Sequence, residues 1–160
     1  MDEIERNVIK NSEYIIEYYK RKEKFITNLE LQKLMYFLEA IYMVATNEEY
    51  LYNDGFVAWS FGPVNLEIYN KYKSFGRGSI VLEQDIDINN TNLKYIINLY
   101  ELFKDFNATE LVNLSHSEGS PWLEIYKSCR GVIPRDKIIS KRKTKEWFSS
   151  LVNKVNEKYQ

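Results

Sequence analysis

The stretch from Leu31 to Ala45 constrains the fold most. Its only strongly polar side chains are Gln32, Lys33 and Glu39. A helix that is apolar on nearly all sides must be surrounded by other elements, so the sequence predicts that this helix lies at the centre of the fold. Gln32 and Glu39 are seven residues apart and share one helical face. We expect that face to touch water or a partner.

Further helices are expected on both sides of this segment. Apolar residues recur at helical spacing, or start signals occur, over residues 3–22, 63–76, about 92–103, 107–116, from 120 onward and 144–158. Thr27 and Asn107 are each followed by a glutamate three residues later, and Ser120 precedes a proline, which are typical helix starts. The expected fold class is therefore mainly α, a compact domain of about six to eight helices.

A small β-hairpin is expected between the second and third helices. Asp54-Gly55 suits a tight turn, with short strands at residues 51–52 and 56–59. A lone hairpin is marginally stable, so it must pack on the helices. Gly62 is expected to form a structural turn with Pro63, at a place that a Cβ would obstruct. Pro63 also fits the first turn of the third helix.

Composition bounds the function classes. The chain has 160 residues, of which 44% are hydrophobic and 28% charged, so we expect one folded domain over residues 1–160. A net charge of −1 gives no global attraction to nucleic acid or membranes. Met1 to Asn7 shows no signal-peptide pattern, and no apolar run reaches the ~18 residues that span a bilayer. The lone Cys129 cannot form an internal disulfide, so a cytoplasmic location is expected.

Residues for catalysis are mostly missing. Cys129 and His116 are too few for a zinc site, so no metal or cofactor is expected. Ser115 and His116 are neighbours, and on a helix their side chains diverge by about 100°. No phosphate-binding or nucleophile-elbow motif occurs. We therefore expect no catalytic residue, and we expect His116 to satisfy the end of a helix.

Several short motifs occur along the chain in a specific order. They are Leu-Gln-Lys-Leu-Met-Tyr at 31–36, Ala-Trp-Ser-Phe-Gly-Pro-Val at 58–64, Ile-Tyr at 68–69 with Tyr72 and Gly76, and Leu111, Leu114, Ser115, His116, Pro121 and Trp122. This order and spacing resembles the Panacea domain family. The resemblance is strongest over residues 27–139, with helical extensions at 1–26 and 140–160. It implies structural roles for Trp59, Gly62, Pro63, His116, Pro121 and Trp122.

The resemblance also implies a function. Panacea domains are mostly helical, have no known catalysis, are found in prophages, and include antitoxins that neutralise unrelated toxins by direct binding. We therefore expect a non-enzymatic protein-binding module, foremost an antitoxin. One alternative is a phage-encoded inhibitor or regulator of a host defence or metabolic enzyme. Another is a nucleic-acid-associated factor that uses the basic C-terminal helix.

The residues expected to bind the protein partner lie on three segments. They are Tyr52 and Phe56 by the expected turn, Glu83, Asp85 and Asp87 in the irregular segment 77–91, and Glu39 on the central helix. Loops on a rigid scaffold carry recognition, aromatic side chains supply anchors, and carboxylates speed the encounter with a basic partner. The alternative is that the aromatic residues pack inward and the acidic loop is only solvated.

The C-terminal helix combines positive charge with an apolar face. Residues 135–160 carry a net charge of +5, and the densest run contains Lys141, Arg142, Lys143 and Lys145. This run is either a contact to phosphate or simply a solvated helix start, and we prefer the solvated start. The apolar face of residues 147–155 is expected to dock on the core or to form a homodimer.

Overall fold

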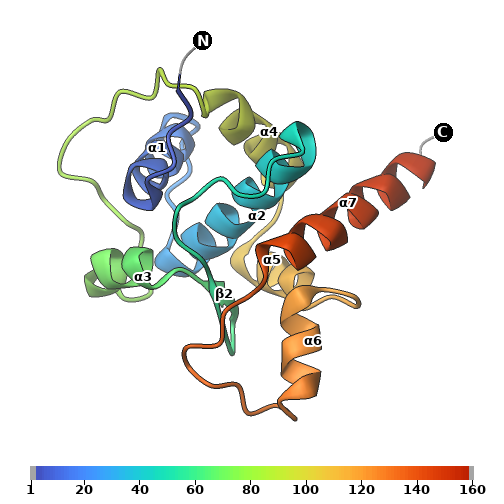
Figure 1. Cartoon of the computed structure of the whole chain (residues 1–160). Coiled ribbons are helices and arrows are strands. Elements are labelled where there is room, and N and C mark those ends of the chain that lie inside the picture. Colours follow the sequence, from blue (N-terminus) through green and yellow to red (C-terminus); the bar gives the residue numbers. More distant parts are fainter. Residues whose placement is uncertain (1–2, 159–160) are drawn as a thin grey trace.

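The computed structural model describes residues 3–158, with side chains as far as Val155, and shows a mainly helical fold (Figure 1). The elements are α1 (Val8–Arg21), α2 (Asn28–Thr46), β1 (Val57–Trp59), β2 (Gly62–Val64), α3 (Leu66–Tyr72), the 3-10 helix η1 (Lys73–Phe75), α4 (Leu93–Phe103), α5 (Ala108–Ser115), α6 (Pro121–Ser128) and α7 (Lys141–Lys158). The expected fold class, with a hairpin between α2 and α3, is confirmed. Residues 1–2 and 159–160 of the expected domain lie outside the described part.

Helix α2 is the centre of the fold, as its composition predicted. It contacts α1, α3, α4, α5, α7 and β2, and Figure 1 shows it running through the middle of the other helices. The Thr27–Glu30 capping box starts it, as predicted. The expected open face of α2 is wrong, because Gln32 and Glu39 are both 2% exposed. Each is buried because neighbouring backbone groups satisfy its polar atoms: the N–H of Asn65 donates to Gln32, and loop amides donate to Glu39.

The other helices begin at the side chains that cap them. Asn7 accepts a hydrogen bond from the N–H of Lys10, so α1 begins at Val8 and not at residue 3 as predicted. Asn107 caps α5 and Ser120 caps α6, as their patterns predicted. Helix α7 begins at Lys141, three residues before the predicted start.

The hairpin lies in the expected interval, but its turn was misplaced. β1 and β2 pair antiparallel, with Trp59 opposite Gly62, so the turn is Ser60-Phe61 and not Asp54-Gly55. The prediction followed the local preference of Asp-Gly. In the fold, residues 50–55 are instead held as a loop by the side chains of distant residues.

Pro63 was predicted to lie in the first turn of α3. It lies in β2 instead. It is opposite Ala58, whose N–H donates to the carbonyl of Lys137 on the far side of β1. Ala58 therefore forms its backbone hydrogen bond away from β2. Proline is tolerated opposite it, because no N–H from position 63 is needed to bond Ala58. Helix α3 begins later, at Leu66, because the side chain of Asn65 caps it.

Residues 77–91 form an irregular strap, as expected, although the strand considered at 80–82 is reduced to one bridge. Ser79 pairs with Thr27, and the N–H of Ile80 donates to the carbonyl of Ile26 at 2.8 Å. Ile80 is buried beneath this contact. The start of the strap is thereby fixed to the N-terminus of α2.

Helix α7 docks on the core through its first turns. Phe37 on α2 lies within ring-contact distance of Phe103, Trp147 and Phe148. Trp147 and Phe148 are buried, whereas Val155 is 48% exposed. The later part of α7 extends away from the other helices in Figure 1.

Candidate functional site

A buried lysine joins the central helix to the hairpin. The side chain of Lys33 is fully buried, and its Nζ donates to the carbonyl oxygen of Pro63 at 2.8 Å. Burial lowers the pKa of Lys33 to about 7, because the charged form loses its hydration. The lysine therefore serves as an internal hydrogen-bond donor that positions β2.

Gly62 allows this close approach. Its φ is +110°, and a Cβ at this position would lie 2.7 Å from Ser115 Oγ and 2.9 Å from Lys33 Cε. The obstruction expected at Gly62 is thus present, although the residue lies in β2 just after the turn. Glycine lets β2 pack directly against α2 and α5.

An aromatic stack continues from this packing. His116 ends α5, and its ring stacks on Trp122 with centroids 3.5 Å apart. Trp122 follows Pro121, the first residue of α6, and its Nε1 donates to the carbonyl oxygen of Trp59 at 2.6 Å. The indole of Trp59 in turn donates to the carbonyl of Arg135 at 2.9 Å. The six residues expected to have structural roles therefore meet around the hairpin.

The Ser115–His116 pair does not form a nucleophilic dyad. Ser115 Oγ donates to the carbonyl of Val112 in its own helix at 2.8 Å. Burial, with the nearby Lys33 as a second cause, lowers the pKa of His116 to about 4, so its imidazole is neutral at pH 7. Its Nε2 is buried without a hydrogen-bond partner in the described structure, and the end of α5 is bonded by the backbone N–H of His116 and not by its imidazole as expected. The serine proton is thus directed to the helix backbone and not to a base.

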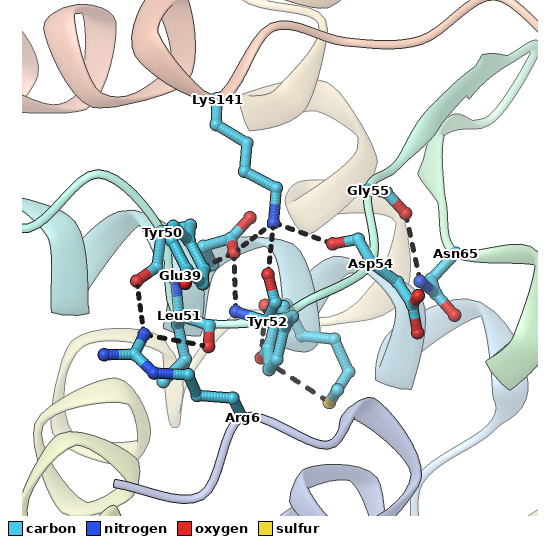
Figure 2. Close-up of polar contacts among 10 residues, drawn as sticks. Arg6, Glu39, Tyr50, Leu51, Tyr52, Asp54, Gly55, Asn65 and Lys141 are labelled. Carbon is cyan, nitrogen blue, oxygen red and sulfur yellow. Dashed lines mark hydrogen bonds and ion pairs between the residues drawn. The ribbon is translucent and has the colours of Figure 1, made fainter.

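A second polar cluster fixes the loop of residues 50–55 (Figure 2). Glu39 Oε2 accepts hydrogen bonds from the amides of Leu51 and Tyr52 at 3.0 and 2.9 Å. Lys141 lies 2.7 Å from the same carboxylate and also donates to the carbonyls of Tyr52 and Asp54. We call this arrangement the Glu39–Lys141 clamp. It compensates a buried carboxylate with a charge and with amide donors.

Two further bonds complete the loop, as Figure 2 shows. Arg6 donates to the carbonyl of Tyr50 at 3.0 Å, and Asn65 donates to that of Gly55 at 3.0 Å. Because the loop is drawn inward, Tyr52 is 0% and Phe56 is 2% exposed. These two residues and Glu39 have no surface to offer a partner directly. Sequence could not place them, since Lys141 is 102 positions from Glu39.

The three acidic candidates of the strap are exposed. Glu83, Asp85 and Asp87 all lie at the surface, and Asp85 forms an exposed ion pair with Lys20 at 3.3 Å. The strap itself is fixed to α1, because Glu17 accepts a hydrogen bond from the N–H of Ile86 at 2.9 Å. These carboxylates are accessible on a tethered backbone.

The basic run at the start of α7 is largely occupied by internal contacts. Lys141 belongs to the clamp, Lys143 lies 2.7 Å from a carboxylate oxygen of Glu124, and Lys145 donates to Asn47 at 2.7 Å. Arg142 is exposed. This usage argues against a phosphate contact, and it also differs from the solvated helix start preferred from the sequence, because Lys141 and Lys145 are partly buried.

The tip of the hairpin is a surface that the sequence interpretation missed. Phe61 is 65% exposed at the turn. Two hollows of about 310 and 460 Å³ lie beside it, and both are lined in part by Trp59 and Ser60. One signal was available, because turn positions usually carry small or polar residues and a phenylalanine there is unusual.

Neither a metal site nor a membrane span is found in residues 3–158. Among the side chains that the structure describes, as far as Val155, no group of three His, Cys, Asp or Glu is arranged to hold a metal ion. None of the described helices is both long and apolar enough to cross a membrane.

Comparison with known families matches residues 31–123 to a domain described as antitoxin SocA-like, Panacea domain. The matched range is more than half of the chain, and it contains Lys33, Trp59, Gly62, His116 and Trp122. The chain belongs to the Panacea domain family. The resemblance noted in the sequence is thereby confirmed.

One curated relative of this Panacea-domain chain is the antitoxin SocA of Caulobacter vibrioides strain NA1000 / CB15N. The two are 30% identical over an alignment of 114 positions, which covers 61% of this chain and 58% of the relative. The chain thus spans somewhat more than half the length of that relative. No solved structure matches.

Some contacts of the two clusters cross the boundary of the Panacea match. The stack around the hairpin and Glu39 lie inside residues 31–123. Lys141, which neutralises Glu39, and Arg135, which accepts from Trp59, lie outside it. In this chain, therefore, residues that follow the matched range complete contacts that begin within it.

Proposed function

We propose that the protein neutralises a cognate protein toxin by binding it directly, without turnover. The observation that carries this proposal is membership of the Panacea domain family, together with 30% identity to the antitoxin SocA. A cytoplasmic setting fits the single Cys129, which forms no disulfide.

The polar chemistry supports binding and not catalysis. Lys33, Glu39 and Ser115 each direct their polar atoms to backbone groups of the protein itself. The bonds of Lys33 and Glu39 fix β2 and the loop of residues 50–55 on the central helix, which lowers the entropy cost of recognition. Glu39, Tyr52 and Phe56 then contribute indirectly, by holding the loop of residues 50–55.

The exposed strap supplies the charge for encounter. Glu83, Asp85 and Asp87 project from a backbone tied to α1, so a toxin with a basic surface is attracted to a fixed place. Complementary charge chiefly raises the association rate, and this effect weakens as salt rises.

Co-expression tests the proposal. Proteins encoded beside the gene are expressed with and without this protein, growth is recorded, and complexes are recovered by affinity purification. We expect one neighbour to arrest growth, to be neutralised, and to co-purify. The matched pair of variants is Glu83→Lys/Asp85→Lys/Asp87→Lys and the control Glu48→Lys/Glu49→Lys/Asp105→Lys, which reverses three exposed acids elsewhere.

We expect the strap variant to slow association and weaken neutralisation, and the control to neutralise like the wild type. Equal neutralisation by both variants would remove the strap from the proposal. Failure of every neighbour to be neutralised or to co-purify would contradict the antitoxin function itself.

A further inference from the structure

We propose that the hairpin tip is the docking site for an acidic, apolar segment of the partner protein. This inference rests on the proposed function and gives the toxin a specific contact. By hairpin tip we mean Trp59, Ser60 and Phe61, together with the two hollows beside them.

The hairpin tip has the shape of a knob between two recesses. One hollow, of about 310 Å³, lies between the tip, the start of α2, and α3, and includes Leu29, Val64 and Tyr69. The other, of about 460 Å³, lies between the tip and the segment after α6, and includes Tyr126 and Ile133. Phe61 is 65% exposed, so a large apolar side chain is presented to solvent beside apolar recesses. Recesses of this kind receive the apolar anchors of a partner.

The tip is held in place before a partner arrives. Tyr69 packs edge-on against Trp59 with centroids 5.0 Å apart, and the guanidinium of Arg135 lies 4.3 Å from the centre of its ring. Directly after Phe61, Gly62 and Pro63 are fixed by Lys33 in the core. Phe61 is therefore presented by a rigid turn, which reduces the ordering cost of binding.

Each hollow is lined by one basic side chain and by no acidic one: Lys73 lines the first and Arg135 lines the second. On one flank, the segment from residue 71 to 82 carries three cations and no acid; on the other, residues 130–137 carry three cations and one acid. These exposed cations are Lys71, Lys73, Arg77, Arg130, Arg135 and Lys137.

None of these six cations forms an ion pair with a described residue. Seven other cations of the described chain do pair with carboxylates, Lys143 with Glu124 for example. Of the six unpaired cations, Lys73 lines one apolar recess and Arg135 lines the other, and carboxylates of a partner would complement them. The acidic residues of the strap, Glu83 to Asp87, follow soon after Arg77, so one part of the surface favours acidic groups of a partner and the adjoining part favours basic groups. This arrangement would orient a bound toxin.

Single-stranded nucleic acid also binds to aromatic side chains among cations. Two observations favour a protein segment. Tyr69 and Arg135 already occupy the surroundings of the Trp59 ring, which limits its use as a platform for bases. The neighbouring carboxylates Glu83 and Asp85 would repel a phosphate backbone that continued along the surface.

The test uses the full chain and displayed random peptides of about twelve residues. Peptides are selected on the wild-type protein, and the enriched sequences are synthesised and titrated by fluorescence anisotropy. We expect enrichment of Asp and Glu beside bulky apolar residues. We expect Phe61→Ala and the double variant Lys73→Glu/Arg135→Glu each to weaken binding at least tenfold. Matched controls are Phe25→Ala, an exposed aromatic, and Lys94→Glu, an exposed cation, and both should bind like the wild type.

Three results would overturn the proposal: no enriched peptide, enriched peptides without acidic residues, or unchanged binding by folded Phe61→Ala. Tighter binding of a single-stranded oligonucleotide that is lost in the Lys73→Glu/Arg135→Glu variant would assign the tip to nucleic acid instead. Any of these results, with toxin neutralisation intact, would leave the antitoxin function standing. Loss of neutralisation by the controls as well as by Phe61→Ala would also reject the tip as the specific contact.

Discussion

Lys33 Nζ and the carbonyl oxygen of Pro63 are joined by a 2.8 Å hydrogen bond between the central helix and the hairpin. Both partners belong to the part of the chain that matches the Panacea domain. The buried amine of Lys33 is used to position β2, and the adjacent turn, Ser60-Phe61, stays at the surface. Lys33, a buried lysine with a lowered pKa, therefore has a structural role, which is to fix the hairpin on α2.

Changing Gly62 to alanine is expected to destabilise the protein. The new Cβ would lie 2.7 Å from Ser115 Oγ, and the φ of +110° is unfavourable for any L side chain. We expect a loss of about 1–3 kcal/mol, measured as a lower melting temperature. The matched control is Gly55→Ala, whose Cβ would meet only Ile138 at 4.0 Å. Equal melting temperatures for the two variants would contradict the close packing at Gly62.

Burial of Lys33 predicts a pH dependence of stability. Its pKa is about 7 in the folded state, against 10.5 as the ordinary value, so between these values the unfolded chain binds more protons. Stability should therefore rise from pH 7 towards pH 10, by at most about 1.4 kcal/mol per pH unit. Above about pH 10 it should fall, because burial raises the pKa of Tyr72 to about 12 and unfolding releases its proton.

Denaturant unfolding across this pH range measures the effect. Lys33→Met should remove the rise between pH 7 and 10 while keeping the fall at higher pH. A wild-type profile that is flat between pH 7 and 10 would show that Lys33 keeps an ordinary pKa in the folded protein.

Breaking the Glu39–Lys141 clamp should loosen the loop of residues 50–55. Lys141→Met leaves the buried Glu39 carboxylate with only two amide donors, so we expect a loss of about 3–5 kcal/mol. Hydrogen exchange at the amides of Leu51 and Tyr52 should accelerate. The control Lys143→Met removes an exposed pair with Glu124 and should cost less than about 1 kcal/mol. Unchanged exchange at both amides would show that the loop does not depend on the clamp.

The docking of α7 is tested by two truncations of side chains on the same helix. Phe148→Ala should cost about 3–5 kcal/mol, because Phe148 is 3% exposed and packs near Phe37. Val155→Ala should stay within about 0.5 kcal/mol, since Val155 is 48% exposed. Similar melting temperatures for the two variants would contradict a docked first half of α7.

The sequence predicted what local patterns determine. Capping side chains such as Thr27, Asn107 and Ser120 act on N–H groups within the next few residues, so their helix starts were readable. Local preference failed at Asp54-Gly55, where contacts from Lys141 and Asn65 override the expected turn. It also failed for Glu39, whose partner Lys141 lies 102 positions away. The exposure of Phe61 was missed because the turn was expected at Asp54-Gly55, so the unusual phenylalanine at the actual turn was not recognised.

The central claim is that this Panacea-domain protein neutralises a toxin by direct binding. The most direct measurement is an isothermal titration of the purified full chain with the purified toxin that co-expression identifies. The account predicts a saturable complex whose affinity falls in parallel with growth rescue across the strap and hairpin-tip variants. Growth rescue by the wild type without any heat of binding, or binding that is unrelated to rescue across the variants, would contradict it.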